Sequence, residues 1–379
     1  MRVVIAPDSF KGTATAREVV QALAEGWATV DPDVEVIARP MADGGEGTVQ
    51  ALASGPGARL HQVAATGPDG RPVQAQWLSL DDGGVSTAVI ELAQSCGITQ
   101  METLAPLDAH TLGLGEVILA ALDDGCERLL VAVGGSASTD GGTGALRALG
   151  ALLEDGDGAP VVLGARGLES LTRIDLSALV ALPAGGVTVL TDVTNPLTGP
   201  AGAAAVYGPQ KGADPDEVGR MDAALGRLAV LVEQLRPDAP DPAAPGAGAA
   251  GGTAYGLAVW GASFAPGAVA IADAIELDVA LAGADLVVTG EGRYDGQSGQ
   301  GKVVSEVARR AAAAGVPVAL VAGAIDAPTD TLAAAVSLTE LAGSSQGAMS
   351  ETLHWLREAG AALARSRGKI ASTLVREQG

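Results

Sequence analysis

Short apolar runs alternate with helix-like patterns along most of the chain. The runs are rich in Val, Leu, Ile and Ala and are bounded by Gly, Pro, Asp or Ser. Nearly continuous apolarity is typical of strands buried on both faces, as in a parallel sheet with crossover helices. The pattern therefore predicts strands at Val3–Ala6, Val34–Ala38, Leu129–Val133, Val187–Leu190, Asp285–Thr289 and Val316–Val321.

The first strand leads into a well-marked helix. Thr15 and Glu18 have the spacing of a capping box, in which each side chain bonds the backbone N–H of the other residue. Apolar residues then recur at helical spacing, at Val19, Val20, Leu23 and Trp27. The combination predicts a helix that begins after Thr15.

The length of the chain suits two domains. A domain typically has roughly 100–200 residues, and this chain has 379. Its two ends are alike in their strand–helix units, whereas the middle has longer loops and glycine clusters. We expect an α/β fold in which 1–60 and 283–379 build one doubly wound parallel-sheet domain and 61–282 form an inserted second α/β domain. The Pro-rich stretch 236–252 is predicted to be a linker.

Charge and cysteine content narrow the class of function. The formal net charge of −22 disfavours binding to nucleic acid or to an anionic membrane, because both need a basic surface. Two cysteines cannot build a disulfide framework and suit a reducing cytoplasm. The N-terminal MRVVIA lacks the apolar region of a signal peptide. The uncharged stretch 242–272 is too rich in Pro, Gly and Ala to predict a membrane span.

Five polar, glycine-rich segments follow strands or open helices, where open α/β sheets bind ligands. The first two, 8–12 and 42–48, place a lysine or several glycines beside a predicted helix N-terminus. Such groups suit an anion, either a phosphate or a carboxylate, and the neighbouring acids could hold a metal ion. The candidates are Asp8, Ser9, Lys11, Asp43, Gly44, Gly45 and Glu46. A solvated turn or a tight connection is the structural alternative.

The third and fourth segments each follow a predicted strand directly. Segment 134–142 combines glycines, hydroxyls and one acid, as in a cradle for phosphate or substrate, with candidates Gly134, Gly135, Ser136, Asp140, Gly141 and Gly142. In the fourth segment, Asp192 and Asn195 can ligate Mg²⁺ or orient a nucleophilic hydroxyl. Lys211 could neutralise charge on a transferred phosphoryl group. A helix cap is the alternative role for Asp192.

The fifth segment, 289–302, nearly matches the sequence motif of a P-loop, in which Lys302 would be the lysine. Val303 follows where that loop needs a metal-binding hydroxyl, so a P-loop NTPase is rejected and only phosphate binding is kept. The dinucleotide-like glycines at 246–251 follow no strand, and the nucleophile-elbow pattern at 343–347 lacks a suitably placed acid before its histidine. Both are discounted. Together the five segments suggest phosphoryl transfer without naming the acceptor.

At these segments the chain closely resembles the bacterial glycerate kinase family. The motifs IAPDSFKG, ADGGEGT, GGSAxxDGG, DVxNPL, GPQKGA and TGEGRxDxQSxxGK occur in the family's order, and SLTELAG follows at 337–343. Each motif is short, but six in order are highly specific. Thr139 stands where the family often has Asn, and Val303 and Val304 replace a Pro-containing stretch, but neither change removes a charged group.

The resemblance implies a cytoplasmic kinase that uses ATP and Mg²⁺ to convert D-glycerate to 2-phosphoglycerate or 3-phosphoglycerate. It also implies a flavodoxin-like domain with a second α/β domain inserted. On this basis Asp192 would accept or orient the proton of the glycerate hydroxyl, and Lys211 and Lys302 would offset phosphoryl charge. Substrate would be bound by Asp8, Ser9, Lys11, Asn195 and Arg293, and Mg²⁺ by Asp43, Glu46, Glu291 and Asp295.

Other functions stay open on the sequence alone. A kinase of another small hydroxy acid is the nearest alternative, and a nucleotide-binding protein without turnover and a serine hydrolase are more distant ones. The expected partners are ATP and D-glycerate, with no nucleic acid and no membrane, and a homodimer is left open.

Overall fold

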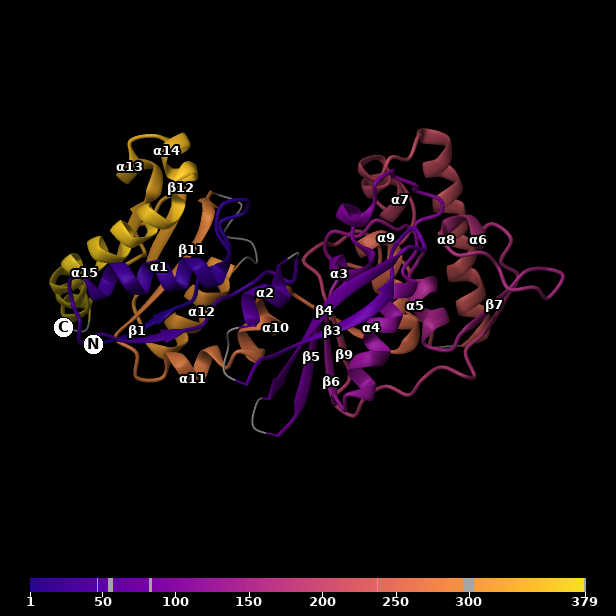
Figure 1. Cartoon of the computed structure of the whole chain (residues 1–379), viewed down its shortest axis with the longest axis horizontal. Coiled ribbons are helices and arrows are strands. Elements are labelled where there is room, and N and C mark those ends of the chain that lie inside the picture. The colour runs from indigo at the N-terminus through magenta and orange to yellow at the C-terminus, as the bar shows by residue number, and fades with distance from the viewer. Residues whose placement is uncertain (46, 54–56, 82–83, 237, 296–302, 378–379) are drawn as a thin grey trace. The chain divides into compact units, whose positions relative to one another are not determined.

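The computed structural model describes residues 1–379 except 46, 54–56, 82–83, 237, 296–302 and 378–379, and no side chain beyond residue 366. The chain forms two compact units, which are described separately. Unit 1 comprises Met1–Asp43, Gln50–Ala58 and Ala268–Gly379, and unit 2 comprises Gly44–Val49 and Arg59–Gly267. Both termini therefore belong to unit 1 (Figure 1). The predicted domain division, 1–60 with 283–379 and an inserted 61–282, stays a prediction.

Unit 1 is built on a parallel sheet. Its described strands lie in the order β13 (Ala334–Ser337), β12 (Val318–Ile325), β11 (Leu286–Tyr294), β1 (Arg2–Ile5) and β2 (Glu35–Ala38). Every pairing among them is parallel. Numbered along the unit, this order is 2-1-3-4-5, that of flavodoxin-like sheets, so the predicted doubly wound sheet is confirmed. The strand order reverses between β1 and β11, where such sheets bind ligands.

Two long helices of unit 1 pack tightly against each other. Helix α1 (Ala16–Ala28) begins with the predicted capping box, in which the Thr15 N–H donates to the Glu18 carboxylate at 2.9 Å. It lies along α15 (Thr352–Glu377) so closely that a Cβ on Gly26 would collide with the Arg357 carbonyl oxygen. The other helices here are α11 (Leu277–Leu281), α12 (Val303–Ala314), α13 (Leu338–Ala342) and α14 (Ser345–Ser350), together with most of α2 (Thr48–Leu52) and α10 (Gly267–Ala274).

Unit 2 contains a mixed sheet. Its strands lie in the order β10 (Ser263–Ala265), β9 (Val187–Leu190), β6 (Arg128–Ala132), β5 (Ser86–Glu91), β4 (Pro72–Asp81) and β3 (Arg59–Thr66). The sheet is parallel from β10 to β5, but β4 pairs antiparallel with both β5 and β3. A small separate sheet pairs β7 (Leu152–Glu154) with β8 (Arg173–Asp175). This unit therefore has a mixed α/β architecture, in agreement with the α/β fold class predicted from the sequence.

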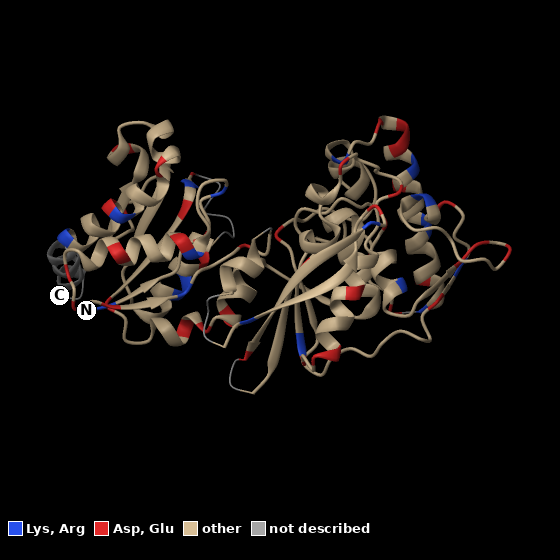
Figure 2. Cartoon of the chain, in the orientation of Figure 1, with Lys and Arg blue, Asp and Glu red and all other residues tan. Residues whose placement is uncertain are grey.

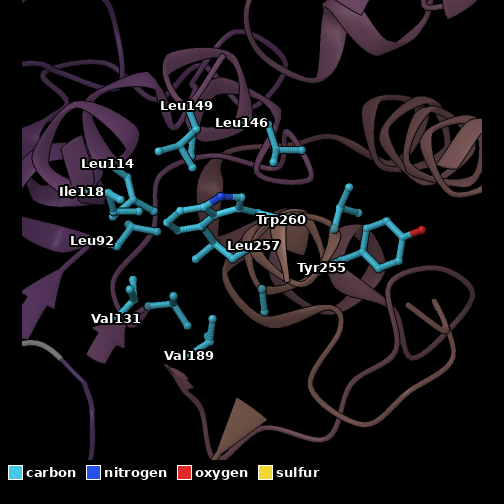
Figure 3. Packing of buried hydrophobic residues seen from close by; sticks show 14 of the residues in the cluster. Leu92, Leu114, Ile118, Val131, Leu146, Leu149, Val189, Tyr255, Leu257 and Trp260 are labelled. Carbon is cyan, nitrogen blue, oxygen red and sulfur yellow. The ribbon is translucent and has the colours of Figure 1, made fainter. Parts of the chain in front are cut away.

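Helices cover this sheet and enclose an apolar core. They are α3 (Ala93–Cys96), α4 (Leu112–Asp123), α5 (Thr143–Ala148), α6 (Ala165–Leu168), α7 (Ala203–Tyr207), α8 (Pro215–Leu235) and α9 (Ala249–Trp260), with 3₁₀ turns η1 (Ile98–Gln100) and η2 (Pro209–Lys211). Figure 3 shows the core residues Val131, Val189, Leu114, Leu146 and Leu257, contributed by β6, β9, α4, α5 and α9.

The Pro-rich stretch 236–252 is not a linker between the units, because unit 2 continues on both sides of it. Its final part is buried, with Ala247 and Ala249 only 1% and 2% exposed. Ala250 and the two glycines after it have φ values of 52°, 68° and 83°, so the backbone turns sharply where small residues allow it. Within the described residues, no helix is long and apolar enough to cross a membrane.

Candidate functional site

Polar loops meet at one edge of the unit 2 sheet. Strands β6 and β9 are parallel neighbours, so the segments 134–142 and 191–195 that follow them emerge at the same edge. The loop around Gly44 also reaches this edge, because a Cβ on Gly44 would lie 2.8 Å from the Leu190 side chain. The candidates gathered here are Gly44, Gly45, Gly134, Gly135, Ser136, Asp140, Gly141, Gly142, Asp192, Asn195 and Lys211.

Asp140 anchors the 134–142 loop. The Asp140 side chain is fully buried, and its Oδ2 accepts hydrogen bonds from the backbone N–H and the hydroxyl of Thr111 at 2.9 and 2.8 Å. Its carboxylate also accepts from the backbone N–H groups of Gly142 and Gly144 at 3.0 and 3.1 Å. The carboxylate therefore fixes the loop's conformation, rather than facing solvent as a ligand-binding acid would.

Lys211 is buried beside the same loop. Its side chain is 3% exposed, and Nζ donates to the Ser138 carbonyl oxygen. Burial lowers the pKa of Lys211 to about 8, and the nearby negative charge of Asp140 opposes that shift. Lys211 is therefore mostly protonated at neutral pH, and its positive charge is held in place.

Asp192 and Asn195 differ in their surroundings. The Asp192 side chain is exposed at the end of β9, and its Oδ1 accepts from the Gly267 N–H at 3.1 Å. Asn195 Nδ2 donates to the Ala201 carbonyl at 2.8 Å, and its Oδ1 accepts from the Tyr207 hydroxyl at 2.7 Å. The Asp192 side chain is thus exposed at the sheet edge, whereas Asn195 closes its own loop.

The remaining described candidates gather in unit 1. A cavity of about 400 Å³ lies where the strand order reverses, and the loops after β1 and at the end of β11 line it. The predicted residues in its wall are Asp8, Ser9, Lys11, Asp43, Glu291, Arg293 and Asp295. Glu46 and Lys302 lie outside the described residues.

Charge in this cavity is mixed. Burial raises the pKa of Asp8 to about 6, with a further rise from the negative charge of Asp43, while the Ser9 N–H and Lys11 act in the opposite direction. Lys11 Nζ lies 3.5 Å from Asp43 Oδ2, and the Lys11 side chain is 79% exposed. Arg293 pairs with Asp326 at 3.2 Å. The cavity therefore offers carboxylates and two cations to a ligand.

Oxygen donors for a metal ion are present in this cavity, but not as a closed cage. Over the part of the chain that the structure describes, no group of three or more His, Cys, Asp or Glu side chains is arranged to hold a metal. Mg²⁺ is usually bound by one or two carboxylates together with substrate phosphates. The residues present, Asp43, Glu291 and Asp295, fit that mode of binding.

Comparison with known proteins places the chain in a family. The glycerate kinase family matches residues 3–367. This chain belongs to that family. A glycerate kinase from Bacillus subtilis (strain 168) is 42% identical over 330 residues, which cover 86% of this chain and 85% of the relative. A glycerate 2-kinase from Escherichia coli (strain K12) is 41% identical over 331 residues, or 86% of each chain.

A solved crystal structure has the same fold as this family member. The protein in that structure is described as glycerate kinase 2 from Salmonella typhimurium LT2. Its structure matches this chain with a TM-score of 0.86 at 39% sequence identity. The match covers 97% of this chain and 98% of that one.

Sequence reasoning missed a buried carboxylate in this glycerate kinase family member. Glu91 ends β5, is 1% exposed, and accepts from the backbone N–H groups of Gly47 and Val49 at 2.9 and 3.2 Å. It therefore holds the glycine-rich loop at 44–48. A single charged residue at the end of an apolar run is the signal that could have indicated it.

The glycines at 246–251 have a structural role that their sequence pattern did not predict. They are not a dinucleotide motif, but the Gly248 N–H donates to the Asn195 carbonyl at 2.9 Å, and the Gly141 N–H donates to the Gly251 carbonyl at 3.0 Å. This segment therefore joins the two polar loops that follow β6 and β9.

Proposed function

We propose that this chain transfers the terminal phosphoryl group of ATP to the 2-hydroxyl of D-glycerate. The observation that carries the proposal is its similarity, at 42% and 41% identity, to a glycerate kinase and a glycerate 2-kinase over most of their length. The convergence of the 134–142 and 191–195 loops in unit 2 supports it, since phosphoryl transfer depends on positioned polar groups.

Asp192 is our candidate for the group that orients or deprotonates the acceptor hydroxyl. Its carboxylate is exposed, yet one oxygen is fixed by the Gly267 N–H, which leaves the other oxygen in a defined place. A positioned general base contributes roughly 10²–10⁴-fold in rate. We expect Asp192→Asn to lower kcat by about that factor, because the amide cannot accept the proton.

A matched control is Asp241→Asn. Asp241 is also exposed and accepts one backbone hydrogen bond, from the Ala243 N–H at 2.8 Å, but it lies outside the polar loops. Its substitution should leave kcat unchanged. Near-full turnover of a correctly folded Asp192→Asn protein would rule out the assignment.

Lys211 and Lys302 are proposed to offset charge on the phosphoryl group. Lys211 would act through the loop that it holds, since its Nζ bonds the Ser138 carbonyl. In unit 1, Lys11 and Arg293 would bind an anionic group of a substrate, either a phosphate or a carboxylate.

We propose that Mg²⁺ is bound by one or two of the carboxylates of the unit 1 cavity, Asp43, Glu291 and Asp295, together with substrate phosphates. When bound, the ion would shield the negative charge of the phosphates. We expect activity to disappear in excess EDTA and to return on adding Mg²⁺ in excess of the chelator. Activity that persists in EDTA would contradict a metal requirement.

The reaction is tested by ADP release in a coupled assay with D-glycerate, tartronate and lactate. Preference for D-glycerate supports the proposal, and preference for another acid supports the nearest alternative. Nucleotide binding without ADP release would indicate a non-catalytic protein. Phosphorus NMR of the product separates 2-phosphoglycerate from 3-phosphoglycerate. A cytoplasmic location and a homodimer stay predictions, the latter open to light scattering.

A further inference from the structure

The unit 1 cavity has an apolar wall that the glycerate reaction does not require. Its strand-end loops contribute the charged residues already described, but α13 and α14 contribute Leu338, Ala348 and Met349. Leu338 and Ala348 are 1% and 4% exposed, whereas Met349 is 64% exposed. A large exposed methionine beside a cavity is available to a ligand without any rearrangement of the core.

The backbone on the strand side of the cavity carries little bulk. Gly292 and Gly323 both line it, and a Cβ on Gly323 would collide with the Gly292 carbonyl oxygen. The Thr339 hydroxyl donates a hydrogen bond to the Gly323 carbonyl oxygen at 2.7 Å, which fixes the edge of the cavity. The cavity is therefore lined by backbone and small residues at the ends of β11 and β12 as well as by the apolar residues of α13 and α14.

The two proposed substrates differ in whether they have an apolar surface that can pack against this wall. Glycerate has three carbons and each carries oxygen, so it has no apolar face to bury. ATP has a purine with two apolar faces and, at its other end, a polyphosphate. A cavity of about 400 Å³ that combines cations and carboxylates with an apolar wall matches the second molecule.

We propose that the cavity of unit 1 binds the nucleotide, with the purine against Leu338, Ala348 and Met349 and the phosphates toward Lys11. The inference rests on the proposed function and names the substrate of this site. It also selects phosphate over carboxylate as the anion for Lys11. The cavity lies between the ends of β1 and β11, the reversal point at which doubly wound sheets bind nucleotides.

The test replaces Met349 by alanine and measures two constants. Thioether and aromatic ring attract each other and exclude water, so Met349→Ala should raise the Kd of MgADP in calorimetry by about three- to tenfold. The KM for ATP should rise by a similar factor, while the KM for D-glycerate stays unchanged. Inorganic tripolyphosphate, which lacks the base, should bind the variant and the unaltered protein equally.

The matched control is Val279→Ala. Val279 lies on α11 in the same unit, is also 64% exposed, and does not line the cavity. It should change neither constant. A rise in the KM for D-glycerate alone, an equal loss of tripolyphosphate binding, or no change in ADP affinity would each overturn the assignment. If the unaltered protein releases no ADP with D-glycerate but the ADP shift occurs, the proposed reaction fails while the nucleotide site stands.

Discussion

Buried charges in unit 2 are bound by backbone groups. Glu91 accepts two backbone N–H groups, and Lys211 donates to a backbone carbonyl. Leaving a charged group in the interior is costly unless such bonds are made, and breaking one of them leaves its partner without a bond. Conservative substitutions of the residues that shape these loops should therefore lower the free energy of unfolding even where they do not alter the fold.

Replacing Glu91 by glutamine tests this sensitivity. The glutamine amide keeps one acceptor, but its NH₂ group would face a backbone N–H of Gly47 or Val49. We expect a loss of about 1–3 kcal/mol in the free energy of unfolding, measured by urea denaturation, together with a lower kcat. Glu102→Gln removes a partner of Arg71 that is 81% exposed, and it should lower the free energy of unfolding much less, because exposed ion pairs contribute little. Equal losses in the two variants would contradict the positioning role.

The depressed pKa of Lys211 predicts a pH dependence. Because the folded pKa of about 8 lies below the ordinary 10.5, the unfolded state binds more protons between these values, and stability due to this group rises with pH. Relative to Lys211→Met, the intact protein should gain about 2 kcal/mol in free energy of unfolding from pH 7 to pH 9.5. Urea denaturation of both proteins at each pH cancels all other titrating groups. If the difference in free energy of unfolding between the two proteins stays constant or falls with pH, Lys211 is not a buried lysine with a lowered pKa.

At the scale of single residues, the motifs indicated which polar loops gather at the edge of the unit 2 sheet, but not the residues that support those loops. Asp192 and Lys211 were proposed as site residues because glycine-rich segments at strand ends are typical of ligand sites, and their roles stay predictions. Glu91 was missed because a lone glutamate has no spacing to recognise. Asp140 was recognised, but its structural role depends on Thr111, which is distant in sequence and joined to it only in the folded chain.

At the scale of elements, close packing of helices depends on glycine. A Cβ on Gly26 of α1 would meet the backbone of α15, whereas a Cβ on Gly219 within α8 would meet nothing within 4 Å. Gly26→Ala should destabilise unit 1 by about 1–3 kcal/mol, since backbone must move. Gly219→Ala should stabilise the chain by about 0.5–1 kcal/mol, because alanine loses less entropy in a helix. Thermal melting of both variants checks the prediction, and shifts of the same sign would refute it.

All six predicted strands correspond to strands of the structure. Continuous apolar runs mark strands buried on both faces, although the edge strand β2 is exposed or only partly buried. Strands β3 and β4 were not predicted. Their apolar residues alternate with Gln and other polar residues, as Gln62, Gln74 and Gln76 illustrate, and several of these positions are at least partly exposed. A search for apolar runs passes over such strands, although their alternation with period two is itself a strand signal.

At the scale of the whole molecule, acidic residues outnumber basic ones by 45 to 23, and Figure 2 shows them on helices and loops of both units. Repulsion among these charges opposes the compact state and is screened by salt. We expect the Tm to rise by about 1 °C, equivalent to about 1 kcal/mol, between roughly 0.02 and 0.2 M KCl. Calorimetry at constant pH measures this, and a Tm that falls with salt would show that attractive ion pairs dominate.

The pairing of β1 with β11 has a consequence for synthesis on the ribosome. Where Thr289 bonds the Ala6 carbonyl, the two partners are separated by 283 residues. At roughly 5–20 residues per second, the first strand must wait about 15–60 s for its neighbour to be translated. The middle of the polypeptide can fold during that delay. A nascent chain arrested when synthesis reaches its last quarter should therefore already resist protease in its middle, while its N-terminal part is still cut.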